Sequence, residues 1–339
     1  MIDLNTIWFL LVGVLIIGYA ILDGFDLGVG VLHRLAKTDH ERRIFLNAVG
    51  PFWDGNEVWL LTGGGALFAA FPVVYATVFS AFYLALMLLL FALIFRAVSL
   101  EFRSKEESPS WRNAWDWAFF LGSLLPSILF GVALGNIMRG IPLDANGTFT
   151  GNFFGLLNPY SVLIGLVSLA MLTWHGANYL TMKTEGDLQN RAAQWANKAW
   201  LAFVILYGVA TILSPMTAPH LFEGVLSNPL FYLLVFLMLA SVIGSPYFLR
   251  KMEYGKAFLA SSVSIASIIG LVAVGLFPRL VPSSTDLAYS LTIYNAASTP
   301  KTQMVMLIIA LLGMPLVIGY TIFIYRQLRG KVVIGEDSY

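Results

Sequence analysis

Long apolar runs recur along the whole chain, and short polar segments separate them. Nine of these runs approach or exceed the roughly 20 residues that an α-helix needs to cross the hydrocarbon core of a bilayer. They lie at about 7–32, 50–70, 73–97, 114–136, 159–182, 196–215, 229–249, 256–277 and 303–325. The runs are continuous rather than alternating, which predicts membrane-spanning helices and argues against a β-barrel. We therefore predict an all-α membrane protein with nine transmembrane helices in a single integral membrane domain over residues 1–339.

Two similar segments suggest an internal repeat. Residues 131–135 read Gly-Val-Ala-Leu-Gly and precede Pro142, and residues 271–275 read Leu-Val-Ala-Val-Gly and precede Pro282. On this hypothesis the domain consists of a first four-helix bundle, a second four-helix bundle and one additional ninth helix, over residues 1–136, 159–277 and 303–325. The matches are few, so an unduplicated arrangement stays an equal alternative.

Basic residues mark every second connection between the apolar runs. All but three of the 20 Lys and Arg residues fall in segments 33–49, 96–113, 183–198, 250–256 and the tail after residue 325. Because basic loops stay in the cytoplasm, this pattern places the N-terminus outside and the C-terminus inside. An odd number of spans requires the two chain ends to lie on opposite sides of the membrane, and the charge pattern agrees with this. The longest outer connection, residues 278–302, is expected to cap the outer surface.

Composition agrees with this membrane assignment and excludes several kinds of chemistry. Hydrophobic residues make up 58% of the chain and charged residues 12%, whereas about 25% of a soluble protein is charged. A formal net charge of +1 gives no reason to expect a nucleic-acid partner. The absence of cysteine excludes disulfides, thiolate nucleophiles and iron–sulfur clusters.

Two carboxylates lie inside the first predicted span. Asp23 and Asp26 are three residues apart and therefore share one helix face. They precede the first basic loop by about 9–14 Å of helix. A carboxylate at bilayer depth costs about 2.5–3.5 kcal/mol even on the lenient insertion scale, so the pair needs water, a partner or a proton. A proton or cation relay is the functional interpretation, and a hydrogen-bonded pair that locks helices together is the structural one.

A second pair of acids begins the second predicted span. Asp54 and Glu57 have the same spacing and lie at the same, cytoplasmic end. Acids also suit the first turn of a helix because of its dipole, and the flanking Trp53 and Trp59 suit a membrane interface. Since one loop joins the two spans, we expect all four acids to share a wet cleft near the inner face. Asp116, which begins the fourth span, is interpreted as a dipole-favoured helix start.

Several glycines and one histidine are candidates for a phosphate-binding loop and a haem ligand, respectively. The glycines 24, 28, 30 and 63–65 favour close helix packing, and no GK[ST] sequence follows them as a phosphate loop requires. His175 alone among four histidines lies inside a predicted span. It could ligate a haem with a methionine, but a helix–helix hydrogen bond is the better expectation. We predict that this chain holds no redox metal of its own.

Several sequence blocks identify a family that this chain resembles, namely subunit II of the cytochrome bd-type quinol oxidases. The two strongest blocks are Gly18–Gly30, which contains Leu-Asp-Gly-Phe-Asp-Leu-Gly, and Trp53–Trp59, which reads Trp-Asp-Gly-Asn-Glu-Val-Trp. The segments 63–70, 111–117, 150–154 and 282–284 add to the resemblance, which spans nearly the whole chain.

The resemblance implies a function in respiration. Members of this family belong to complexes of a bacterial cytoplasmic membrane that oxidise quinol and reduce dioxygen to water. Haems b558, b595 and d lie in subunit I, and subunit II is a nine-helix partner without a haem. Asp54 matches an acid of a cytoplasmic proton route, Trp59 matches a position linked to oxygen access, and Arg96 matches a basic residue at the inner end of the third span. Some members also hold a structural quinone in this subunit or bind a small single-helix subunit.

One departure and one competing hypothesis accompany the resemblance. The connection at about 216–228 is shorter than in longer members, which puts a loop-borne quinone or small-subunit contact there in doubt. The main alternative to a non-catalytic oxidase subunit is a free-standing ion-coupled transporter that uses Asp23, Asp26 and Asp54. Transporters of that kind place their sites near the bilayer midplane, whereas these acids lie toward one face.

Overall fold

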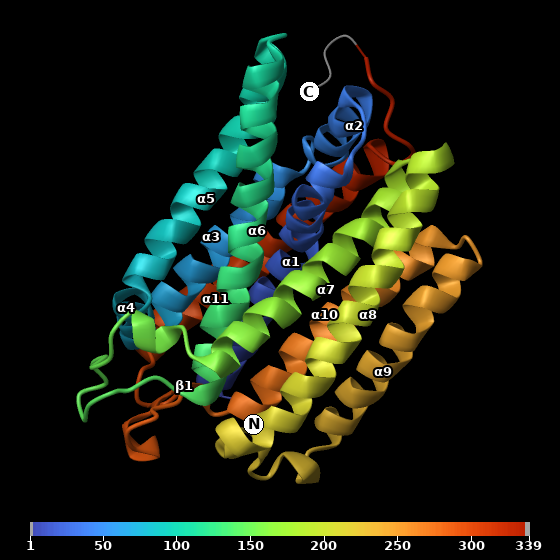
Figure 1. The fold of residues 1–339 in the computed structure, drawn as a ribbon. Helices are drawn as coiled ribbons and strands as arrows, with labels where there is room; N and C mark the ends of the chain where they lie inside the picture. The colour runs from blue at the N-terminus through green and yellow to red at the C-terminus, as the bar shows by residue number, and fades with distance from the viewer. Residues whose placement is uncertain (1–2, 336–339) are drawn as a thin grey trace.

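The structure, a computed structural model, describes residues 3–335 and is almost entirely helical (Figure 1). Eight of the described helices are long and apolar enough to cross a membrane. These are α1 (Leu4–Leu32), α5 (Tyr83–Phe102), α6 (Pro109–Arg139), α7 (Pro159–Lys183), α8 (Gly186–Thr217), α9 (Pro229–Arg250), α10 (Tyr254–Leu276) and α11 (Pro300–Gln327). The prediction of a polytopic helical membrane protein is confirmed.

The predicted second and third spans differ from a pair of simple transmembrane helices. The second is α3 (Trp53–Ala70), whose 18 residues begin with a polar turn, so it is less apolar than the other spans. The third is divided into α4 (Pro72–Ala81) and α5, because Phe82 leaves helical geometry with φ −98° and ψ 15°. Eight of the nine predicted spans are therefore supported by length and composition, and the second, over residues 50–70, stays a prediction.

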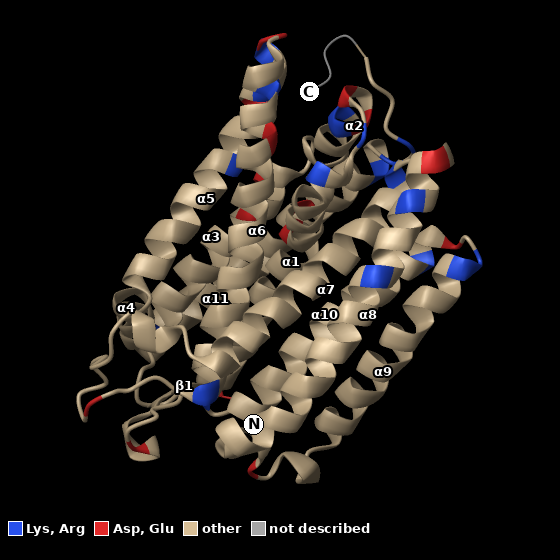
Figure 2. Ribbon diagram, in the orientation of Figure 1, with Lys and Arg blue, Asp and Glu red and all other residues tan. Residues whose placement is uncertain are grey.

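Charge separates the two ends of the molecule. The two chain ends lie at opposite ends of the helical bundle (Figure 1). Lys and Arg gather at the end that carries the surface helix α2 (Asp39–Val49) and the C-terminal tail, while the opposite end has few (Figure 2). We call the first the basic end. The alternation of basic loops is thus borne out in space, and the assignment of this end to the cytoplasm stays a prediction.

The helices α1 and α7 form the centre of the bundle. Of the spanning helices, α7 is the most deeply buried and α11 the least. A Cβ added at Gly28 of α1 would collide with the Leu172 carbonyl oxygen and lie 2.9 Å from Gly176 Cα of α7. Such close backbone approach lets the two helices pack along their glycines. The expected packing role is confirmed for Gly24, Gly28 and Gly30, whereas a Cβ added at Gly64 or Gly65 would meet no atom of another described segment within 4 Å.

The end opposite the basic end is covered by loops. Strands β1 (Arg279–Val281) and β2 (Leu291–Thr292) pair antiparallel, and Ile141 bridges to Ser283. The apolar side chains of these loops and strands are buried at this end, namely Ile141, Leu143, Val281, Leu291 and Ile293. The expected cap over residues 278–302 is therefore present. The described short helices are η1 (His33–Leu35), η2 (Arg103–Lys105), η3 (Phe154–Leu156), η4 (Pro219–Phe222), η5 (Val225–Ser227) and η6 (Leu287–Tyr289).

Candidate functional site: a buried acid cluster

Both intramembrane aspartates of α1 face an arginine from α5. Arg96 Nη2 donates to Asp23 Oδ1 over 2.5 Å and Nη1 donates to Asp23 Oδ2 over 3.0 Å. Arg96 Nη2 also lies 3.9 Å from Asp26 Oδ2. All three side chains are fully buried. A planar guanidinium matches a carboxylate in this two-bond geometry, which offsets part of the cost of burying both charges.

The helix α3 completes the cluster with one acid and one amide. Glu57 Oε1 accepts a bond from Arg96 Nη1 over 3.3 Å, and its side chain is 22% exposed. Asn56 Nδ2 donates to Asp26 Oδ2 over 2.8 Å and to the Leu22 carbonyl over 3.1 Å. We call Asp23, Asp26, Glu57 and Arg96 the acid cluster.

The acid cluster holds more carboxyl groups than cations. Three carboxyl groups share one guanidinium, so full ionisation would leave an excess of negative charge in a largely buried place. Asp23 has both oxygens on Arg96, whereas Asp26 Oδ1 has no hydrogen-bond partner among the described residues. Buried charges are costly unless they are paired, so this arrangement favours protons or water on the under-paired acids.

The structure brings together three of the four acids that the sequence placed in one cleft. Asp54 is exposed on the outer face of α3, one helical turn from Glu57. The four acids therefore do not form one enclosed group. Trp53 and Trp59 are partly buried, and Trp59 packs where a Cβ on Gly18 of α1 would lie. Arg96 is the central cation of the cluster, a position that the sequence analysis did not predict for it.

A second cluster at the basic end was missed by the sequence analysis. Asp116 accepts bonds from Arg103 Nε over 2.6 Å and from Arg42 Nη1 over 2.8 Å, and it lies 2.7 Å from His33 Nε2. The interpretation of Asp116 as a simple helix start was incomplete, because this buried carboxylate ties α6 to η1, α2 and η2. The sequence did contain a signal for this cluster, because Asp116 lies in the apolar run 114–136 directly after the basic segment 96–113.

His175 has the helix–helix hydrogen bonds that the sequence predicted. Its Nδ1 lies 2.7 Å from Ser261 Oγ on α10, and its Nε2 lies 3.0 Å from the Ile21 carbonyl on α1. Its ring stacks on Phe258 with 4.6 Å between centroids. Both ring nitrogens are therefore engaged within the chain.

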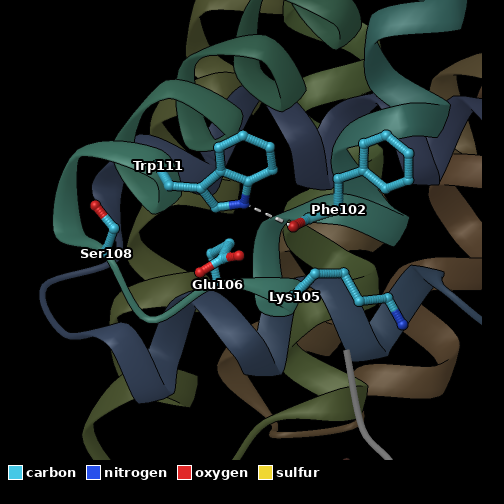
Figure 3. Close-up of a pocket in the computed structure, with 5 residues that line it drawn as sticks. All are labelled: Phe102, Lys105, Glu106, Ser108 and Trp111. Carbon is cyan, nitrogen blue, oxygen red and sulfur yellow. Dashed lines mark hydrogen bonds between the residues drawn. The ribbon is translucent and has the colours of Figure 1, made fainter.

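A surface hollow of about 580 Å³ lies apart from the acid cluster (Figure 3). Phe102, Lys105, Glu106, Ser108 and Trp111 line it, all from the connection between α5 and α6 and its flanks. Trp111 Nε1 donates to the Phe102 carbonyl over 2.8 Å, which closes one wall. The hollow includes none of the candidate site residues.

The fold places this chain in the class of polytopic α-helical membrane proteins, and the ion-paired acids inside its bundle are a candidate functional site. Comparison with known proteins narrows this class. The family model of the cytochrome bd terminal oxidase subunit II matches residues 4–328. The chain therefore belongs to this family.

Individual relatives agree over almost their full length. The cytochrome bd-I ubiquinol oxidase subunit 2 of Escherichia coli K12 is 40% identical over 360 residues, which cover 97% of this chain and 95% of the relative. The cytochrome bd ubiquinol oxidase subunit 2 of Bacillus subtilis 168 is 41% identical and covers 98% of both chains. A chain in the structure of the bd oxidase from Geobacillus thermodenitrificans shares the fold, with a TM-score of 0.78, 19% identity, and coverage of 96% and 98%.

Proposed function

We propose that this chain scaffolds a haem-bearing subunit I in a bd-type quinol oxidase and conducts protons toward it from the cytoplasm. The complex would oxidise quinol and reduce dioxygen to water, which consumes protons together with electrons. The observation that carries the proposal is the under-paired acid cluster, in which Asp26 Oδ1 is buried without a hydrogen-bond partner among the described residues. Such an oxygen can take up and release a proton.

The exposures of the acids support a route inward. Asp54 is exposed, Glu57 is 22% exposed, and Asp23 and Asp26 are fully buried. Asp54 and Glu57 are separated by one turn of α3, and Glu57 shares Arg96 with Asp23. A proton accepted at Asp54 could therefore pass to Glu57 and then to Asp26, with water bridging the steps. We assign Asp54, Glu57, Asp23 and Asp26 to this route.

The outer face of α3 is the surface proposed to meet subunit I. Along it Asp54, Val58, Leu61 and Phe68 are exposed, and Gly65 leaves space for close approach by another helix. An acid directed from a spanning helix toward lipid would be costly, so a protein partner is a better neighbour for Asp54. Trp53 and Trp59 flank this face, and their expected contribution to the interface or to oxygen access forms part of the proposal.

The haems are proposed to reside in subunit I rather than in this chain. His175 supports this assignment because Ser261 and the Ile21 carbonyl already engage its two nitrogens. A haem ligand would need one of these nitrogens free to bind iron. The catalytic redox steps would then belong to the partner, and this chain would supply structure and protons.

The Asp54→Asn variant tests the outermost step of this route. We expect oxygen consumption to fall on the order of ten-fold, equivalent to about 1.4 kcal/mol in the barrier, because the amide cannot accept and release the proton. Haem content per complex should stay unchanged, since Asp54 is exposed rather than packed in the core. An oxygen electrode and visible spectra of the purified complex measure both quantities.

The matched control for Asp54 is Glu101→Gln, which removes an exposed acid at the basic end from α5. It should leave both quantities unchanged. Full activity in Asp54→Asn would show that Asp54 lies outside the route, and loss of haem would show that Asp54 is needed to hold subunit I rather than to conduct protons.

A further inference from the structure

The last helix, α11, packs on the bundle along one face and forms hydrogen bonds with other segments at both of its ends. Gln303 is its only buried residue among those described, and α1 and α3 are the helices that it contacts most. At the end opposite the basic end, Trp8 Nε1 donates to the Gln303 carbonyl over 3.0 Å, and Gln303 Nε2 donates to Asn5 Oδ1 over 2.9 Å. Between its ends, Met306, Leu307, Ala310 and Met314 pack against the core, while most of the other apolar side chains of α11 are exposed.

At the basic end, α11 reaches the acid cluster through Tyr325. The Tyr325 hydroxyl donates to Asn56 Oδ1 over 3.0 Å, and Asn56 Nδ2 in turn donates to Asp26 Oδ2 over 2.8 Å. The Tyr325 ring lies against Phe52 with 4.5 Å between centroids and edge-on to Phe25 at 6.4 Å. A chain of hydrogen bonds thus runs from the last helix to the under-paired acid.

The tail after α11 fixes the position of Tyr325. Lys183 Nζ donates to the Leu328 carbonyl over 2.8 Å, and Val332 N donates to the Lys183 carbonyl over 2.9 Å. Lys331 Nζ donates to the Thr184 carbonyl over 2.6 Å, although partial burial lowers the pKa of this lysine. These bonds hold the tail on the end of α7, so that the loosely packed helix does not move Tyr325 away from Asn56.

We propose that Tyr325 is a positioning residue for proton transfer at Asp26 and that it acts through Asn56. An amide can rotate to present either its NH₂ group or its oxygen to a carboxyl group. The Tyr325 hydroxyl engages the Asn56 oxygen, and the Leu22 carbonyl accepts from the NH₂ group. Together these two bonds keep the NH₂ group on Asp26 Oδ2 and leave Oδ1 for the proton. This inference rests on the proposed function, since it assumes that Asp26 carries protons.

The test uses the Tyr325→Phe variant of the complete oxidase complex. This change removes the hydroxyl and keeps the ring against Phe52. We expect the turnover number to fall about three- to ten-fold, the range that loss of one hydrogen bond gives. The KM for quinol and the haem content should not change. The control is Tyr320→Phe on the same helix, where the side chain is 66% exposed, and it should behave as the unaltered complex.

A double-mutant cycle separates positioning from a structural role. If Tyr325 acts through Asn56, then Tyr325→Phe combined with Asn56→Leu is no slower than Asn56→Leu alone. Independent effects that multiply in the double variant would overturn the proposal. Should Tyr325→Phe lose haem, Lys331→Ala takes its place in the cycle, because it loosens the tail and keeps the tyrosine. The proposal then requires that Lys331→Ala combined with Asn56→Leu be no slower than Asn56→Leu alone.

An Asp26→Asn variant distinguishes failure of this inference from failure of the proposed function. A slow Asp26→Asn complex beside a normal Tyr325→Phe complex would overturn only the role of Tyr325. A normal rate in both would overturn the proton route as well.

Discussion

Replacing Arg96 by methionine is expected to prevent most copies of the subunit from folding and assembling into the complex. The variant keeps most of the side-chain volume but leaves Asp23 and Asp26 buried without their cation. Removing one partner of a buried ion pair costs about 3–5 kcal/mol, because the remaining charge has no compensation. That is a large part of the stability of an ordinary folded protein. Subunit levels in membranes and the haem content of the purified complex measure the loss.

Second-site rescue makes the Arg96 prediction specific. Asp23→Asn in the Arg96→Met background removes the carboxylate that lost both hydrogen bonds, and it should restore a substantial part of the assembled complex. Arg250→Met, at the exposed end of α9, removes a cation of the basic end outside any buried pair and should have little effect. Normal assembly of Arg96→Met, or no recovery with Asp23→Asn, would contradict the ion-pair argument.

The second large effect is expected at the crossing of α1 and α7. In Gly28→Ala the new methyl group meets the Leu172 carbonyl and the Gly176 backbone, so the helices must separate. Overpacking costs typically 1–3 kcal/mol, and this variant should lie at the upper end because backbone atoms cannot rotate away. We expect a lower melting temperature of the purified complex and less of it in the membrane.

The matched control for the helix crossing lies on the same helix. Gly13→Ala adds the same methyl group where no heavy atom among the described residues lies within 4 Å. It should be neutral or stabilise α1 by up to about 1 kcal/mol, since alanine is the better helix former. Equal stability of the Gly28 and Gly13 variants would show that α1 and α7 do not depend on this close approach.

The spanning helices were predictable because each depends on local sequence. Apolar runs of sufficient length define α1 and α5–α11, and the alternation of basic loops places their ends on two sides. The same reasoning treated the segment 73–97 as one helix, because the departure at Phe82 has no glycine or internal proline to mark it. The polar first turn of α3 was visible in sequence, but its effect on membrane crossing was underestimated.

The orientation of a helix about its axis decided which acids meet. Residues three apart are separated by about 60° around a helix, so both members of a pair can face the interior or only one can. In α1 both aspartates face inward, whereas in α3 Glu57 reaches Arg96 and Asp54 faces outward. Spacing correctly placed Asp23 and Asp26 on one face, but it did not do so for Asp54 and Glu57, because the rotation of α3 depends on its packing against α1.

Contacts between distant segments lay beyond local reasoning. Tyr325 and Asn56 are 269 positions apart, and neither residue type is unusual in a membrane helix. Asp116 likewise reaches His33 across 83 positions. An intramembrane arginine does signal a nearby acid, and Arg96 was therefore the residue from which the acid cluster could have been found.

Proton uptake by the Asp26→Asn complex tests the central claim most directly. The fully reduced complex is mixed with dioxygen, and uptake from the cytoplasmic side is followed with a pH-sensitive dye, with Glu107→Gln as an exposed-acid control. The proposed route predicts uptake slowed on the order of ten-fold or more, with haem content unchanged and the control normal. Uptake at the unaltered rate in a fully assembled Asp26→Asn complex would contradict a proton route through these acids.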